Sequence, residues 1–121
     1  MEKIIEESRK LLKSIDQQQV LFGFISLKVE EFLNNEENQV QYGTFKSFLA
    51  ECGQSLKQIT PFKEAARWCE EVGISKEEAM NIPVSKLYLL ARLETPMSDD
   101  LLYNLKELSY SDLKIMYGQN N

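Results

Sequence analysis

The chain has 121 residues, of which 43% are hydrophobic and 27% are charged, and its formal net charge is −5. This length fits one domain with a single core, and the negative charge argues against broad, salt-sensitive adhesion to nucleic acid or anionic lipid. The first residues, MEKIIEESRKLLK, lack the apolar region of a secretory signal peptide. We therefore expect a cytoplasmic protein that has no contact with a membrane.

The stretch from Val20 to Val29, VLFGFISLKV, is the most apolar run in the chain. It is too short to span a bilayer, which needs roughly 20 such residues. A helix that is apolar on nearly all sides must be enclosed by other helices. The sequence therefore predicts that the remaining chain wraps around this segment.

Apolar residues between Ile4 and Phe32 also follow a heptad pattern. The two seam positions hold, in turn, Ser8, Ile15, Phe22 and Val29, and Ile4, Leu11, Gln18, Ile25 and Phe32. Four such heptads can form a coiled coil, so a homodimer through Ile4–Phe32 is one interpretation. The other, which we favour, is an internal core helix, because a two-stranded coil would expose Val20, Phe24 and Leu27. The polar residues SIDQQQ leave open whether this segment is one helix or two.

The chain then breaks into short helices with recognisable start signals. The polar segment 34–39 is predicted to be a surface loop, and Thr44 is expected to cap the helix that follows it. Ser55 can start a single helical turn. Thr60 followed by Pro61 is typical of a helix start, with proline at the first helical position.

Serine residues mark the predicted helix starts in the carboxyl-terminal third of the chain. Ser75 with Glu78 forms a capping box, and later helices are expected to open at Ser85, Ser98 and Ser111. Neither strand-like alternation nor an internal repeat is found.

These elements predict an all-α fold with one globular domain over 1–121. A long core helix at 1–34 would be enclosed by about five or six short helices at 42–118.

The sequence contains few candidates for catalytic residues. Histidine is absent, which removes the commonest general base and metal ligand. Cys52 and Cys69 lack the spacing and partners of a zinc site, and we expect both to be buried, reduced thiols. Adjacent carboxylates such as Glu70 and Glu71 point in different directions on a helix, and no phosphate-binding glycine loop is present. The sequence therefore predicts no cofactor, no metal ion and no enzymatic activity.

A locally basic segment runs from Gln54 to Arg67. Its candidate nucleic-acid contacts are one amide and three cations, namely Lys57, Gln58, Lys63 and Arg67. A helix, a glycine turn and a second helical segment at 44–72 give the outline of a helix-turn-helix. The alternative interpretation of the same cations is an ordinary solvated surface.

The order of segments after the first helix resembles a known family. The chain reads YGTFKSFLAECG, then SLKQITPFKEAARWCEEVG, then IPVSKLYLLARLE, and then LKELSYSDLK. Over residues 42–115 it is similar to the helix-turn-helix modules of ParB- and KorB-type proteins and their phage and plasmid relatives. Their P-x-S-x-L-x-x-L-A-x-L segment is matched here by Pro83, Ser85, Leu87, Leu90, Ala91 and Leu93. At the recognition segment that family usually reads S-x-S-x-A-Y-R, where this chain has SLKQITP. The resemblance implies an origin in a mobile genetic element.

Two functional hypotheses result. The first is a non-catalytic regulator or inhibitor from a phage or other mobile element, which binds a host nucleic-acid-handling protein as anti-CRISPR proteins do. Acidic side chains would complement a basic groove on that partner; the candidates are Glu30, Glu31, Glu36, Glu37, Glu70 and Glu71. The second is a DNA-binding helix-turn-helix regulator, or a partition or replication accessory protein, that uses the four basic-segment residues.

Overall fold

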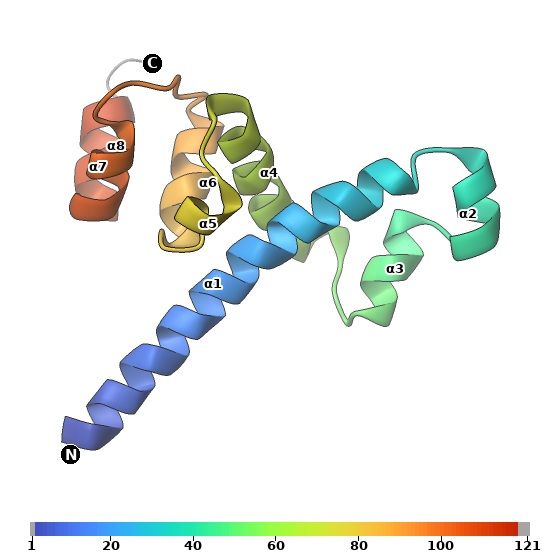
Figure 1. The fold of residues 1–121 in the computed structure, drawn as a ribbon, viewed down its shortest axis with the longest axis horizontal. Coiled ribbons are helices and arrows are strands. Elements are labelled where there is room, and N and C mark those ends of the chain that lie inside the picture. Colours follow the sequence, from blue (N-terminus) through green and yellow to red (C-terminus); the bar gives the residue numbers. More distant parts are fainter. Residues whose placement is uncertain (1, 119–121) are drawn as a thin grey trace.

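The computed structural model describes residues 2–118, which form eight helices and no strand (Figure 1). Their bounds are α1 Glu2–Phe32, α2 Glu36–Tyr42, α3 Phe45–Glu51, α4 Leu56–Val72, α5 Lys76–Ala79, α6 Val84–Arg92, α7 Leu101–Glu107 and α8 Tyr110–Gly118. The predicted all-α fold with a long amino-terminal helix is confirmed, and α1 is one continuous helix. None of the helices in 2–118 is long and apolar enough to cross a membrane.

Helix α4 is the centre of the hydrophobic core. It packs against α1 on one side and against α6 on the other, and α8 packs on α6. Trp68 and Cys69 are its largest contributions to the core. Five leucines from α6, α7 and α8 are fully shielded from solvent: Leu87, Leu90, Leu101, Leu105 and Leu113. Helices α2 and α3 lie beyond the carboxyl end of α1, away from this core (Figure 1).

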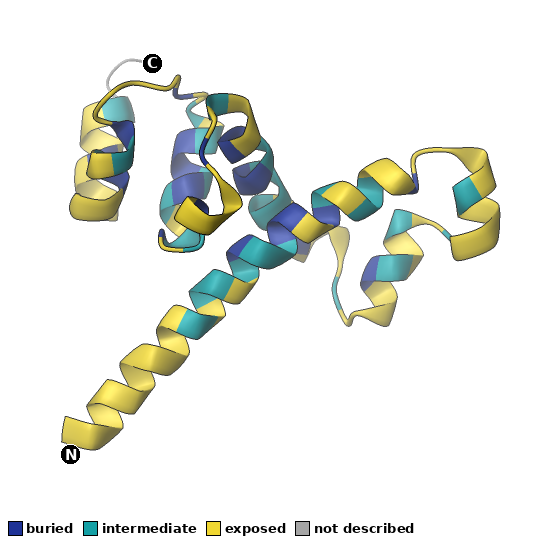
Figure 2. Cartoon of the chain, viewed as in Figure 1, coloured by how far each residue is buried: buried dark blue, intermediate teal, exposed yellow. Residues whose placement is uncertain are grey.

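Helix α1 is divided into a packed half and a projecting half. Val20, Gly23, Phe24 and Ser26 are buried, so the apolar run that begins at Val20 does lie in the core, as predicted. Residues 2–13 are all exposed and extend away from the rest of the molecule (Figure 2). The prediction that other helices enclose the long helix is therefore wrong for its first half, because no other segment of 2–118 reaches that far.

The backbones of α1 and α4 approach very closely where they cross. A Cβ atom added to Gly23 would lie only 2.3 Å from the backbone oxygen of Phe62. Ser26, on the next turn of α1, is also fully buried. Gly23 is unfavourable for an isolated helix by about 1 kcal/mol relative to alanine, and the close packing against α4 explains its presence here.

The predicted helix starts at Thr44 and Ser75 are confirmed. The Thr44 side chain accepts a hydrogen bond from the Ser47 backbone N–H at the start of α3, and the Ser47 side chain accepts one from the Thr44 N–H. Ser75 caps α5 through the Glu78 backbone N–H. Glycine in the left-handed conformation ends α4 at Gly73.

Helix α4 starts earlier than the sequence suggests. The capping box of Ser55 and Gln58 opens a single helix that continues to Val72. Thr60 and Pro61 therefore lie inside α4, and the Thr60 hydroxyl donates a hydrogen bond to the Leu56 carbonyl oxygen. The expected start at Thr60 is wrong because the earlier cap satisfies the first backbone N–H groups. Pro61 is the sixth residue of α4, where it removes one backbone hydrogen bond without ending the helix.

Five other local predictions are also wrong. Helices α6 and α7 begin after Pro83 and Asp100 rather than at Ser85 and Ser98, and neither N-cap residue makes a side-chain cap hydrogen bond. The segment predicted as a loop at 34–39 contains the start of α2, where the Asn35 side chain accepts a hydrogen bond from the Asn38 N–H. The hydroxyl that caps α8 belongs to Ser109, which accepts from the Asp112 N–H, rather than to Ser111. Cys52 is exposed, because it lies at the carboxyl end of α3 and outside the core. Cys69 is buried as expected.

Candidate functional site

Three of the predicted acidic residues come together where α1 crosses α4. Glu30 and Glu31 at the end of α1, and Glu70 on α4, line a hollow of about 450 Å³. Arg67 lies in the same lining, together with Leu27 and Asn34. The crossing of the two helices thus joins residues that are far apart in sequence.

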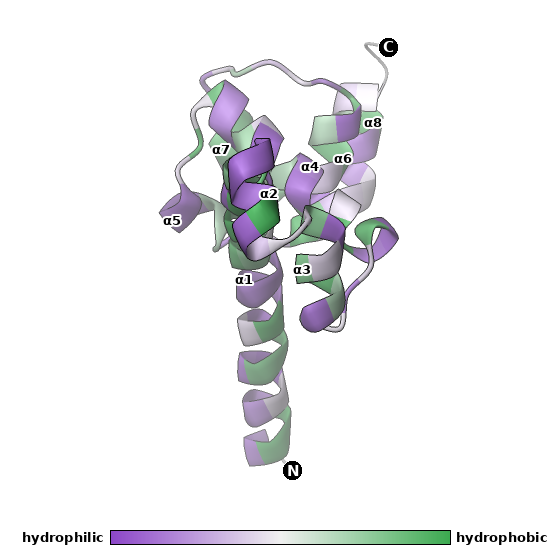
Figure 3. Ribbon diagram, turned by 90° about the vertical axis from the view of Figure 1, so that its right-hand side faces the viewer, coloured by the Kyte–Doolittle hydropathy of each residue, from purple (hydrophilic) through white to green (hydrophobic). Residues whose placement is uncertain are grey.

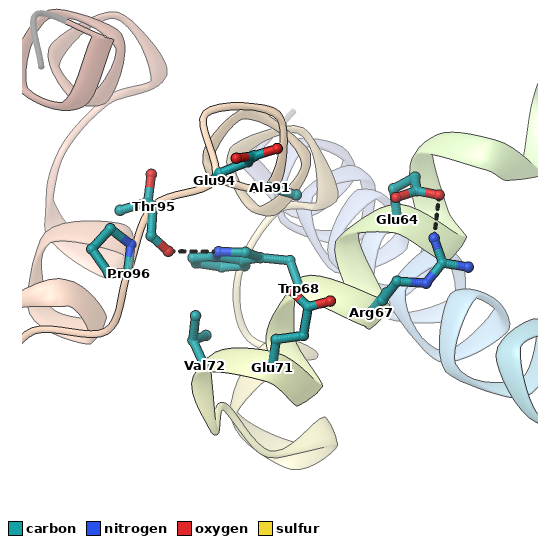
Figure 4. A pocket seen from close by; sticks show the side chains of 9 residues that line it. All are labelled: Glu64, Arg67, Trp68, Glu71, Val72, Ala91, Glu94, Thr95 and Pro96. Carbon is teal, nitrogen blue, oxygen red and sulfur yellow. Dashed lines mark hydrogen bonds and ion pairs between the residues drawn. The ribbon is translucent and has the colours of Figure 1, made fainter. Parts of the chain in front are cut away.

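A second hollow of about 380 Å³ shares Arg67 with the lining of the first, and its lining residues are drawn in Figure 4. Glu71 lines it, together with Glu64 and Glu94, which the sequence did not single out. The Trp68 indole N–H donates a 2.8 Å hydrogen bond to the Thr95 carbonyl oxygen and closes the hollow's floor. Glu94 has a φ of 52°, a backbone conformation that residues other than glycine rarely adopt.

Two cations of the basic segment are paired with carboxylates in this region. The Lys63 ammonium lies 2.8 Å from a Glu30 carboxylate oxygen and 5.4 Å from the centre of the Phe45 ring. The Arg67 guanidinium lies 2.6 Å from Glu64 and 3.7 Å from Glu30. These pairs neutralise Lys63 and Arg67 within the fold.

The other two candidate nucleic-acid contacts lie at the start of α4. Gln58 accepts a hydrogen bond from the Ser55 backbone N–H, so its side-chain oxygen serves the capping box. Lys57 is exposed. The four residues therefore do not form a row of free donors on one helix face.

We call the surface formed by the two hollows the acidic face. Its carboxylates surround the two cations Lys63 and Arg67; they are Glu30, Glu31, Glu64, Glu70, Glu71 and Glu94. Glu36 and Glu37 lie elsewhere, in the first turn of α2. Because negative charge outweighs positive charge here, the face is suited to a cationic partner.

A second surface runs along the projecting half of α1. We call it the N-terminal stripe, and its large apolar side chains are between 48% and 66% exposed: Ile4, Ile5, Leu11, Leu12 and Ile15. Helical spacing places all five on one side of α1, with Ser8 among them. Hydrophobic colour follows one edge of the projecting helix in Figure 3.

The stripe leads into a groove at the point where α1 meets α4. This basal groove has a volume of about 440 Å³ and begins at Ile15. Its other apolar lining residues are Phe22, Ile59 and Phe62, and its polar ones are Gln18, Gln19, Gln54 and Gln58. Apolar surface therefore continues from the projecting helix onto the body of the protein.

The described residues offer no arrangement suited to metal or thiol chemistry. In residues 2–118, no cluster of three or more histidine, cysteine, aspartate or glutamate side chains could hold a metal ion. Burial, with a smaller contribution from the charge of Glu70, raises the pKa of the Cys69 thiol to about 12. A thiol with so high a pKa is not a nucleophile at neutral pH.

Comparison with known proteins does not assign a family. No known family, curated protein or solved structure matches the chain. The functional argument therefore depends on the acidic face and on the other surfaces of the fold.

Proposed function

We propose that this protein is a non-catalytic regulator or inhibitor that binds another protein through its acidic face. The observation that carries the proposal is the convergence of Glu30, Glu31 and Glu70 on one hollow, with Glu71 in the next. A concave surface whose charged lining residues are mostly carboxylates complements a convex, basic surface and speeds its association.

The partner class follows from the charge of the face. Proteins that handle nucleic acid carry lysine and arginine along the surfaces that contact phosphate. We propose that the acidic face occupies such a surface on a host protein, in the manner of an anti-CRISPR inhibitor. Origin in a phage or other mobile element is supported by the resemblance of residues 42–115 alone.

The test is affinity capture from the natural host, with the bound protein identified. The double variant Glu31→Lys/Glu70→Lys reverses two exposed charges of the face. We expect it to lose the partner, and we expect nucleic acid to displace the partner from the unmodified protein. Glu36→Lys/Glu37→Lys makes the same change of charge on α2 and should still capture the partner. Equal capture by both variants would contradict the proposal.

DNA binding by a helix-turn-helix is the alternative hypothesis. It would require Lys63 and Arg67 to exchange their carboxylate partners for phosphates. A gel-shift experiment at low salt with the full chain distinguishes the two functions. A shift that Lys57→Glu abolishes would favour the DNA-binding alternative, whereas the absence of any shift at micromolar protein would remove it.

A further inference from the structure

We propose that a hollow between α6 and α8 is a docking site for an acidic, apolar peptide segment of a protein partner. We call it the α6–α8 hollow, and its volume is about 580 Å³. It shares no lining residue with the two hollows of the acidic face, and the proposal does not depend on the function proposed for that face. The occupant that we propose carries carboxylates beside large apolar side chains.

The apolar part of the α6–α8 hollow comes from both helices. Helix α8 packs on α6, and three residues of each line the hollow: Leu89, Arg92 and Leu93, and Lys114, Ile115 and Gly118. The three residues of α6 lie on one side of that helix, because they are three and four positions apart. Leu89 is only 3% exposed, whereas Ile115 is 60% exposed. The hollow therefore has apolar walls that can accept an apolar side chain of another molecule.

The charged part of the lining is entirely positive. Arg92 and Lys114 contribute one cation from each helix, and both side chains are exposed. Within residues 2–118, neither cation has a carboxylate at ion-pair distance. The carboxylates nearest to them in sequence, Glu94 and Asp112, do not line the hollow, and Glu94 belongs to the acidic face instead. The hollow is thus locally basic in a chain whose net charge is −5.

Contacts within the fold hold Arg92 without neutralising it. Its guanidinium carbon lies 4.9 Å from the centre of the Tyr88 ring, and one guanidinium nitrogen lies 3.5 Å from the Tyr110 hydroxyl oxygen. Neither partner is a carboxylate, so the positive charge remains available to a ligand. A guanidinium that is already held in place loses less conformational freedom when it binds.

The combination of apolar walls and two cations selects the occupant. Affinity for nucleic acid grows with the number of phosphates that are neutralised, and two cations neutralise few of them. The net charge of −5 also opposes adhesion to an anionic membrane. A peptide segment that carries glutamate or aspartate beside leucine or isoleucine matches both parts of the lining. Its apolar side chain would enter between α6 and α8, while its carboxylates would pair with Arg92 and Lys114.

The experiment measures, by fluorescence anisotropy, the binding of a labelled amphipathic helical peptide of glutamate and leucine to the full chain. We expect Arg92→Glu and Lys114→Glu each to weaken binding several-fold, because each replaces an attraction by a repulsion. Lys46→Glu is the matched control: it makes the same change of charge at an exposed residue of α3, far from α8, and should bind as the unmodified chain does (Figure 1). The acidic-face variant Glu31→Lys/Glu70→Lys should still bind the peptide, so the two proposals can fail separately.

A second peptide, with glutamine in place of glutamate, tests whether charge selects the occupant. It keeps the apolar side chains and should bind several-fold more weakly. Absence of binding by the glutamate peptide, equal binding of the two peptides, or binding that neither Arg92→Glu nor Lys114→Glu weakens would overturn the proposal.

Two further measurements address other occupants of the α6–α8 hollow. Sedimentation of the unmodified chain tests for a second copy, and flotation with phosphatidylserine vesicles tests for a lipid surface. We expect Lys114→Glu to change neither result. Self-association or vesicle binding that Lys114→Glu abolishes would assign the hollow to that occupant and overturn the proposal of a peptide.

Discussion

Both halves of α1 carry apolar residues at heptad spacing, but the second half packs against the rest of the protein and the first half does not. In the second half, Val20 and Phe24 are buried against α4, and Gly23 allows the two backbones to meet. In the first half, Ile4 and Leu11 follow the heptad seam and remain exposed. The difference shows that apolar periodicity alone does not say which part of a long helix the rest of the chain packs against.

The largest effect is expected from matched truncations in the two halves. Phe24→Ala should lower the free energy of unfolding by about 3–5 kcal/mol, because it removes a 5% exposed aromatic ring from the core. Leu11→Ala, at a 66% exposed residue, should change it by less than about 0.5 kcal/mol. Chemical denaturation of both variants measures the difference. Equal losses would mean that the first half is also packed in the monomer.

The close crossing of α1 and α4 gives the next prediction. Alanine normally stabilises a helix relative to glycine, but a Cβ at Gly23 would overlap the Phe62 backbone oxygen. Gly23→Ala should therefore destabilise the protein by about 2 kcal/mol, since the two helices must separate to accept it. Ser8→Ala, on the projecting half, is the control and should be neutral or slightly stabilising. A stabilised Gly23→Ala variant would mean that the two helices cross less closely than the structure places them.

The helix starts that could be predicted from the sequence are those set by hydrogen bonds between neighbouring residues. The caps at Thr44 and Ser75 depend on hydrogen bonds that span three residues, so the sequence contains all of the relevant groups. At Ser55 and Thr60 two local signals compete, and the earlier one starts α4, where Ile59 is buried in the first turns of the helix. Helix α2 has no buried residue, so it has no apolar pattern by which it could be found.

The acidic face could be predicted only in part. Glu30, Glu31 and Glu70 were candidates because of their charge, but their convergence depends on where α1 and α4 cross, which no local pattern encodes. The same crossing brings Lys63 and Arg67 to carboxylates and removes them from the predicted basic surface. Glu94 joins the face through a turn with positive φ, for which its sequence gives no signal.

The buried thiol of Cys69 predicts how the stability of the protein depends on pH. The pKa of the buried Cys69 thiol is raised to about 12, whereas an unfolded thiol loses its proton near pH ~8.5. Above that pH the unfolded chain binds fewer protons than the folded chain, so the free energy of unfolding should fall by about 1.4 kcal/mol per pH unit until the folded thiol also ionises. Between pH ~8.5 and about 12, the free energy of unfolding of Cys69→Ala, measured by chemical denaturation, should fall less steeply with pH than that of the unmodified chain.

The smallest effect is expected at the ion pair that joins the packed half of α1 to α4. The Lys63 side chain is only 13% exposed, and Glu30 is its carboxylate partner. Glu30→Gln should cost about 0.5–1 kcal/mol, because Glu30 itself is partly solvated and water already screens the pair. The loss should shrink as salt is added. Glu31→Gln removes the same charge from the next residue, which is exposed, and should cost less. Equal losses of stability in the two variants would mean that the contact between Glu30 and Lys63 adds nothing beyond the charge of Glu30. Apolar packing around Phe24 and Gly23 would then hold this half of α1 against α4.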